Sequence, residues 1–104
     1  MSESYEGHSN WETWNISLWL NNDETMQNEA LRICGQNGKS VYLPAHSITP
    51  QHKAAKLLEE YVFSLLDDNI ITDKVSIHRV DFMEIVKDFQ ETIKENAKYE
   101  ALNQ

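Results

Sequence analysis

Carboxylates are the side chains of this sequence whose number and spacing could support chemistry. Glu59-Glu60 and Asp67-Asp68 are adjacent pairs, and paired carboxylates can exchange protons or hold a metal ion. Adjacent residues of a helix, however, point to different sides of it, which is poor geometry for one catalytic pair. These pairs therefore do not predict acid–base catalysis.

A regular series of carboxylates lies nearer the C-terminus. Five acidic residues follow one another at steps of 3, 4, 3 and 4: Asp81, Glu84, Asp88, Glu91 and Glu95. These steps give one stripe on a helix that rises about 5.4 Å per turn, and phosphates along a DNA strand are about 6–7 Å apart. The stripe could therefore imitate a nucleic-acid backbone coarsely. The alternative is an ordinary solvated face, on which Lys87, Lys94 and Lys98 offset some of the repulsion.

A second block of acidic residues lies in the middle of the chain: Glu59, Glu60, Asp67, Asp68 and Asp73. No Lys or Arg occurs from Leu57 to Asp73. If this block lies beside the stripe, the two form one broad negative surface, and the sequence leaves that adjacency open. We expect a partner to bind at the whole stripe together with Glu59, Glu60, Asp67 and Asp68.

The histidines and the cysteine are not spaced for catalysis or metal binding. Four histidines are scattered along the chain: His8, His46, His52 and His78. Cys34 is the one cysteine, so no internal disulfide can form, and its apolar helical spacing indicates a buried, inert thiol. Because nucleophile-elbow, phosphate-loop and C-x-x-C motifs are also missing, we expect no enzyme activity, no cofactor and no metal site.

The net charge narrows the class of partner. Seventeen Asp and Glu oppose nine Lys and Arg, which gives −8. Direct nucleic-acid binding needs a basic footprint, and an anionic membrane would repel this chain, so we expect neither as a partner. A basic protein or nucleoprotein complex is favoured, although acidity can also serve solubility alone. No apolar stretch approaches the roughly 20 residues of a membrane span, and the oligomeric state stays open.

Three tryptophans, Trp11, Trp14 and Trp19, lie within the first 31 residues, which hold six acidic residues and no Lys or Arg. Tryptophans can stack on nucleic-acid bases, but such platforms usually accompany a basic groove. We therefore expect the indoles to pack in the core, where each N–H needs an acceptor.

The length of 104 residues is typical of one domain. We expect a mainly α fold, with a flexible N-terminus over residues 1–8 and a single compact domain of about four helices over residues 9–104. A small two-stranded β element from residues 40–43 and 74–78 is an open addition, because both segments contain β-prone residues.

Helix boundaries follow from capping residues. Ser9 is expected to cap a first helix that reaches about Leu20, with Glu12 completing a capping box. Trp11, Trp14 and Leu18 fall at i, i+3 and i+7. The apolar arc is widened by Ile16, Trp19 and Leu20, which predicts that neighbours cover most of the circumference of this helix.

The later helices show clearer patterns. Asp23 should cap a second helix over residues 24–35, which buries a row of apolar residues: Met26, Ala30, Ile33 and Cys34. Thr49-Pro50 should start a third helix that ends near residue 66. Its expected apolar stripe contains Ala54, Leu57, Leu58, Tyr61, Val62 and Leu65. Asp81 should cap the fourth helix, with Glu84 completing a capping box and Val80 and Ile85 forming a hydrophobic staple.

Two motifs carry a resemblance to a known family. The first is Asn10-Trp11-Glu12-Thr13-Trp14-Asn15 followed by Leu18-Trp19-Leu20-Asn21-Asn22-Asp23, and the second is Val80-Asp81-Phe82-Met83-Glu84-Ile85. Together they resemble an uncharacterised family of small proteins of phages and other mobile elements, in which Trp stands where this chain has Phe82. The resemblance implies a mobile-element setting and no catalytic residue.

In that setting, small acidic proteins are often inhibitors of host defence. By analogy, the leading hypothesis is an anti-CRISPR or antirestriction inhibitor in the host cell cytoplasm, which binds a basic nucleic-acid-binding surface by charge mimicry. Such an inhibitor could instead bind its target through a small patch of apolar and polar residues, without mimicking the charge of DNA. The alternative hypothesis is a phage regulatory or assembly module that binds a partner without inhibiting it.

Overall fold

The chain folds into helices throughout the part that the structure, a computed structural model, describes: residues 8–35 and 50–102, with side chains as far as residue 95. The elements are α1 (Trp11–Asn22), α2 (Glu24–Cys34), α3 (Gln51–Asp67), the 3₁₀ helix η2 (Ile77–Arg79) and α4 (Phe82–Leu102). No β-strand occurs in these ranges. The predicted mainly α fold with four helices is confirmed.

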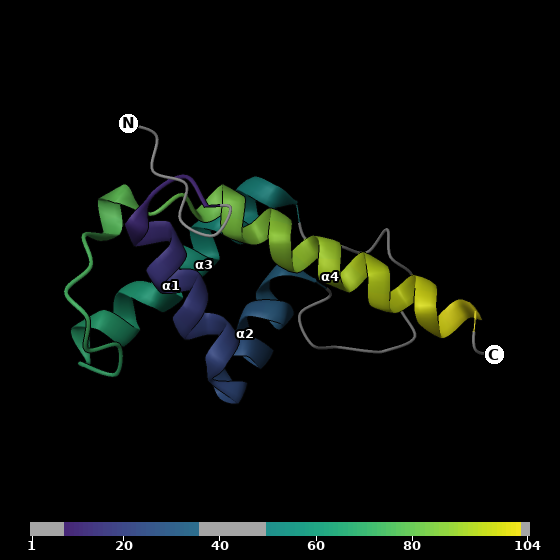
Figure 1. The fold of residues 1–104 in the computed structure, drawn as a ribbon, viewed down its shortest axis with the longest axis horizontal. Helices are drawn as coiled ribbons and strands as arrows, with labels where there is room; N and C mark the ends of the chain where they lie inside the picture. The colour runs from purple at the N-terminus through teal and green to yellow at the C-terminus, as the bar shows by residue number, and fades with distance from the viewer. Residues whose placement is uncertain (1–7, 36–49, 103–104) are drawn as a thin grey trace.

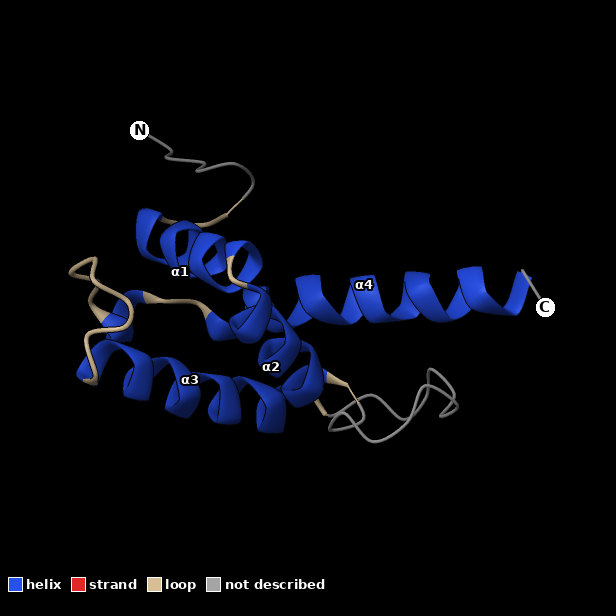
Figure 2. Ribbon diagram, turned by 90° about the horizontal axis from the view of Figure 1, so that it is seen from below, coloured by secondary structure: helices blue, strands red, loops and turns tan. Residues whose placement is uncertain are grey.

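The second helix lies at the centre of the arrangement. It packs against α1, α3 and α4, and α3 also packs along the first half of α4 (Figure 1). Seen from below, α1 and α3 lie on opposite sides of α2, and the C-terminal part of α4 extends beyond the other helices (Figure 2). One end of the molecule is therefore a packed bundle, and the other end is a single helix.

The core draws on all four α-helices and on the segment after α3. The largest fully buried apolar side chains are Ile16, Leu20, Leu58, Val62, Ile71, Ile85 and Val86. The predicted buried row of α2 is confirmed, because Met26, Ala30, Ile33 and Cys34 are all buried. Of the stripe expected on α3, Leu57 and Tyr61 are only partly buried against the core, and the other four residues are buried.

The buried face of α1 differs from the prediction. Leu18 is 38% exposed, and the three tryptophans are only half-buried. Ile16 and Leu20 of the predicted apolar arc are buried, but the helix also buries three polar residues, Thr13, Asn15 and Ser17. The Thr13 hydroxyl and the Asn15 amide N–H group have hydrogen-bond partners outside α1, and the Ser17 hydroxyl accepts from Asn21 of the same helix, which allows their burial; the Asn15 side-chain oxygen is buried without a partner among the described residues.

The first cap is one residue later than predicted. Asn10, not Ser9, is the N-cap of α1, and its side-chain oxygen accepts a hydrogen bond from the Thr13 backbone N–H at 2.9 Å. Asp23 caps α2 as expected, by accepting from the Met26 backbone N–H. The predicted cap Thr49 lies outside the described residues, and Pro50 occupies the N-cap position of α3.

The third helix ends in a Schellman motif. Asn69 adopts φ 59°, in the left-handed region. The Ile70 N–H donates to the Leu65 carbonyl at 2.9 Å, and the Asn69 N–H donates to the Leu66 carbonyl at 3.2 Å. The helix thus stops immediately after Asp67-Asp68, and both carboxylates lie at its negative end.

The suggested β element is not formed in the part that is described. Residues 74–76 are irregular and lead into η2, so the alternation of Val75 and Ile77 marks partly buried loop positions and not a strand. The other half of that element, residues 40–43, and residues 1–7 of the predicted N-terminal segment lie outside the described residues.

Candidate functional site

The two sequence motifs meet in space and hold the start of α4 against α1. The side chain of Thr13, which is fully buried, accepts a hydrogen bond from the Asp81 backbone N–H at 2.8 Å. The Asn10 amide donates to the Arg79 carbonyl at 2.8 Å, and the Glu12 carboxylate lies 3.3 Å from the Arg79 guanidinium. We call these contacts, with those of Glu84 below, the α1–α4 clasp.

The Glu84 carboxylate is bonded within this clasp and does not complete a capping box. Its carboxylate lies 2.9 Å from the His8 imidazole Nδ1 and accepts from the Ser9 backbone N–H at 3.1 Å. Asp81 does cap the helix, by accepting from the Glu84 N–H, but its own N–H is already bonded to Thr13. The capping box is therefore half formed. Its second hydrogen bond, from the Asp81 N–H to the Glu84 side chain, is replaced by the bond from the Asp81 N–H to Thr13.

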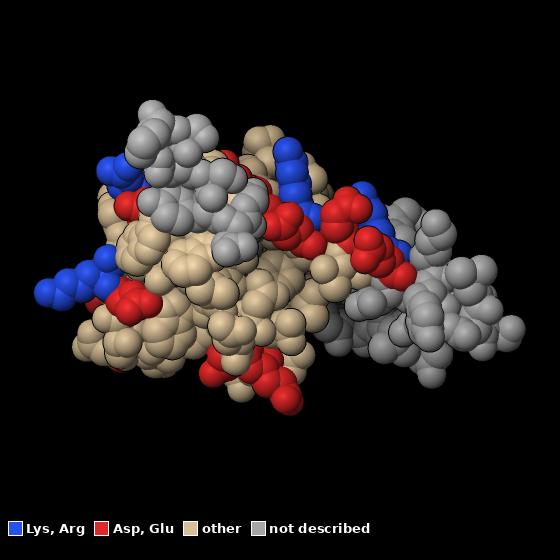
Figure 3. All heavy atoms as spheres, in the orientation of Figure 1, with Lys and Arg blue, Asp and Glu red and all other residues tan. Residues whose placement is uncertain are grey.

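The rest of the acidic stripe faces solvent. The Asp88 side chain is 62% exposed, 4.0 Å from His8 Nδ1, and Glu91 and Glu95 are exposed. In the described ranges none of these three carboxylates has an ion pair with a lysine or arginine, but Lys87 and Lys94 are exposed on the same helix. Figure 3 shows acidic and basic side chains next to one another along α4. Opposite charges therefore weaken the field of the stripe locally.

The acidic residues of α3 form a different surface. Glu59, Glu60, Asp67 and Asp68 are all exposed, and we call them the α3 acidic surface. Figures 1 and 2 place the C-terminal end of α3, where Asp67 and Asp68 lie, at the end of the molecule opposite the C-terminal half of α4. Asp67 and Asp68 are therefore far from that half of α4, and Glu59 and Glu60 lie in the middle of α3.

Asp73 is an acidic residue with a structural role that the sequence did not reveal. Its Oδ2 accepts from the Asn15 side-chain amide at 3.0 Å and from the Trp19 indole N–H at 2.9 Å. These hydrogen bonds, first from Asn15 and then from Trp19, lower the pKa of the Asp73 carboxyl below its ordinary value. Asp73 therefore ties the loop after α3 to α1.

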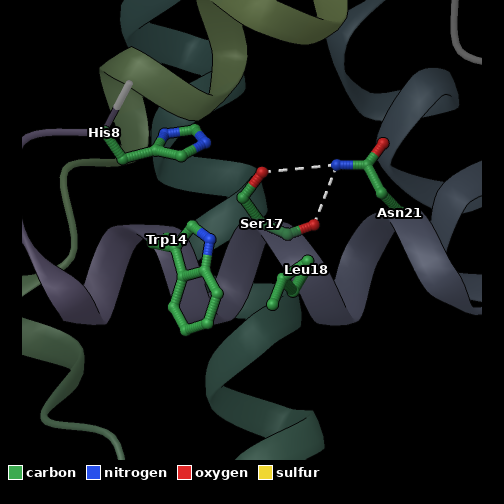
Figure 4. A pocket seen from close by; sticks show the side chains of 5 residues that line it. All are labelled: His8, Trp14, Ser17, Leu18 and Asn21. Atoms are coloured by element: carbon green, nitrogen blue, oxygen red, sulfur yellow. Dashed lines mark hydrogen bonds between the residues drawn. The ribbon is translucent and has the colours of Figure 1, made fainter. Parts of the chain in front are cut away.

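A pocket of about 350 Å³ opens beside α1. Its lining includes His8, Trp14, Ser17, Leu18 and Asn21, as Figure 4 shows. Asn21 donates its side-chain amide to the carbonyl and the hydroxyl of Ser17, at 2.8 and 3.3 Å. The polar groups of this wall are therefore bonded to each other, and the remaining lining is largely aromatic or aliphatic.

Cys34 is the one cysteine of the chain, and its thiol is buried. Burial raises the pKa of the Cys34 thiol to about 12, so that the thiolate nucleophile is scarce at neutral pH. This agrees with the inert thiol that the sequence predicted. No group of His, Cys, Asp or Glu within the described ranges could hold a metal ion. Nor does any helix there combine the length and apolar composition that a membrane crossing requires.

The fold and these surfaces define a small α-helical protein with one group of exposed carboxylates on and after α3 and another along α4. The chain belongs to DUF7249, a family of unknown function whose model matches residues 1–100. No curated protein and no solved structure matches the chain.

Proposed function

We propose that this protein is a stoichiometric inhibitor that occupies a basic, nucleic-acid-binding surface of a host defence complex of the CRISPR or restriction type. It acts in the host cell cytoplasm without catalysis. Binding depends on carboxylates that take the place of phosphates, and the principal contact is the α3 acidic surface.

The observation that carries this proposal is the run of acidic residues on the second half of α3 and directly after it. The run begins after Lys56, which is exposed one turn before Glu59 and Glu60 and offsets part of their charge. Five acidic residues and no basic residue occur between Leu57 and Asp73, and the four on or next to α3 are exposed. The helix ends at Asp67, so the negative end of its macrodipole adds to the same field. Such a field attracts a cationic surface and repels nucleic acid.

The exposed part of the α4 stripe is a weaker candidate for the same contact. Asp88, Glu91 and Glu95 alternate with Lys87 and Lys94, so their net charge is smaller. Asp81 and Glu84, which the sequence placed in the binding set, belong to the α1–α4 clasp. The resemblance of the two clasp motifs to phage and mobile-element proteins supports a defence-related setting, not a particular contact.

A phage-plating comparison tests the proposal. The protein is expressed in a panel of bacterial strains, each carrying one CRISPR or restriction system, beside the same strains with that system deleted. We expect it to raise phage plating in at least one defence-positive strain and to leave the matched defence-negative strain unchanged. Retention of the responsible complex on the immobilised protein should fall as ionic strength rises.

The contrary result is equally specific. If deleting the gene from a phage that carries it impairs growth on defence-positive and defence-negative hosts alike, the protein is a regulatory or assembly module and not an inhibitor of defence.

A further inference from the structure

Exposed apolar side chains are concentrated at the end of α3. The described residues contain three exposed large apolar side chains, and two of them are Phe63, which is 57% exposed, and Ile70, which is 50% exposed. Single exposed apolar residues are ordinary on a protein surface. Phe63 lies on the second half of α3, and Ile70 lies in the turn that ends the helix, so the two exposed side chains are eight residues or fewer apart along the chain and are candidates for contact with a partner.

Carboxylates surround Phe63 on the helix. Residues three and four positions apart are neighbours on a helical surface. Glu59 and Glu60 lie one turn before Phe63, and Asp67 lies one turn after it. All three are exposed, so an aromatic ring that can be buried on binding stands inside an anionic rim. This arrangement combines the anchor and the polar rim of a protein interface.

We infer that this end of α3 binds an amphipathic segment of a protein partner, in which Lys or Arg residues flank one or two apolar side chains. The apolar side chains would cover Phe63 and Ile70, and the cationic ones would meet Glu59, Glu60 and Asp67. This inference rests on the proposed function for the position of the contact. It adds that the partner presents a polypeptide segment with both apolar and basic side chains, and not a groove that is only cationic.

Charge decides against other occupants of the same surface. A nucleic acid or an anionic membrane would place like charge against the rim. A second copy of this chain, related by a two-fold axis, would place Glu59, Glu60 and Asp67 against their own counterparts, which is also repulsive. A polypeptide with basic and apolar side chains is the occupant that would be attracted by the anionic rim and would also bury the apolar anchors.

Two synthetic peptides provide the test. Each is a lysine-rich helix of about 14 residues, roughly four turns. One carries leucines at helical spacing, and the other carries serines at the same positions, so that their net charges are equal. Fluorescence anisotropy measures the affinity of the whole protein for each peptide. We expect the leucine peptide to bind about tenfold more tightly, because it covers the apolar anchors.

The variant Phe63→Ser should remove most of this preference while leaving the serine peptide unaffected. The matched control is Leu18→Ser, which removes an exposed apolar residue from α1 and should keep the preference. Ile70→Ser is a second test variant, in case Phe63→Ser unfolds the protein. Circular dichroism establishes which variants fold.

Several results would overturn the inference. They are equal affinity for the two peptides, a preference that survives both Phe63→Ser and Ile70→Ser, a preference that depends on Leu18, and self-association of the protein that Phe63→Ser abolishes. Equal affinity would leave the proposed function standing, because that function requires charge alone. A failure in the phage-plating comparison would leave the peptide preference standing as a property of the surface.

Discussion

The acidic residues of α3 and those of α4 differ in what surrounds them. On α4, Asp81 and Glu84 are bonded to residues near the N-terminus, and the exposed carboxylates that follow alternate with lysines. On α3, Glu59, Glu60 and Asp67 lie one turn from Phe63, and no Lys or Arg occurs from Leu57 to Asp73. Similar numbers of acidic residues thus serve different purposes: the α4 set partly holds the fold together, and the α3 set is available to a partner.

The largest effect expected from this difference is on the clasp. Thr13→Val keeps the shape of the side chain but leaves the Asp81 backbone N–H without its acceptor. We expect the free energy of unfolding to fall by about 1–3 kcal/mol, measured by urea denaturation. Thr92→Val is the matched control on α4, because Thr92 is exposed, and it should change stability by less than about 0.5 kcal/mol. Equal effects of the two variants would mean that the clasp does not hold α4.

The carboxylates of the α4 stripe should differ from one another in their contribution to stability, with a smaller effect than that of Thr13→Val. Glu84→Gln removes the charge that accepts from the Ser9 N–H and contacts His8, and its side chain is only 26% exposed. We expect a loss of about 1 kcal/mol in the free energy of unfolding. Glu91→Gln, at an exposed position, should be neutral in the same urea titration. If Glu91→Gln were as costly, the stripe would be structural along its whole length.

The α3 acidic surface should be destabilising, in contrast to the clasp. Asp67 is the last residue of α3, where the helix macrodipole disfavours negative charge. Asp67→Lys should therefore raise the free energy of unfolding by about 0.3–1 kcal/mol at low salt, and the gain should shrink at high salt. Glu91→Lys, in the middle of α4, provides the comparison and should show little change. A loss of stability in Asp67→Lys would indicate a structural role for this carboxylate.

Acid sensitivity distinguishes Asp73 from the free carboxylates of its block. Its pKa is lowered in the folded protein, so the folded state holds the carboxylate charged at a pH where the unfolded chain binds a proton. The stabilisation is therefore present above the ordinary aspartate range, near pH 4, and is lost as pH falls through the lowered value. Asp73→Asn should flatten the fall of the melting temperature below about pH 4. Identical acid profiles for wild type and Asp73→Asn would remove the structural role of this carboxylate.

Three of the four helices could be predicted from sequence because their signals are local. Asp23 and Asp81 were identified as caps, and the apolar spacing of α2 predicted its buried row. The first helix was predicted less well, because its large indoles suggested the buried side. The structure buries Thr13 and Asn15 instead, whose partners, Asp81 and Asp73, lie 68 and 58 residues away. Periodicity within one helix contains no information about such partners.

The candidate site was predictable in composition but not in arrangement. The acidic run without lysine or arginine after Leu57 could be read directly from the sequence, and so could the five residues of the stripe. The contact of Glu84 with His8, and the distance between the end of α3 and the C-terminal half of α4, depend on how α1, α3 and α4 pack. The exposure of Phe63 likewise depends on which side of α3 the neighbouring helices cover.

The most direct test of the proposed contact compares equal charge reversals on the two helices. One variant carries Glu59→Lys, Glu60→Lys and Asp67→Lys, and the other carries Asp88→Lys, Glu91→Lys and Glu95→Lys. Both change the net charge equally, and neither replaces a residue of the α1–α4 clasp, although Asp88 lies 4.0 Å from His8 Nδ1. Phage plating on the defence-positive strain that responds to wild type is measured for each folded variant. We expect protection of the phage to be lost in the α3 variant and retained in the α4 variant. Retention of protection by the α3 variant would contradict the assignment of the contact to α3.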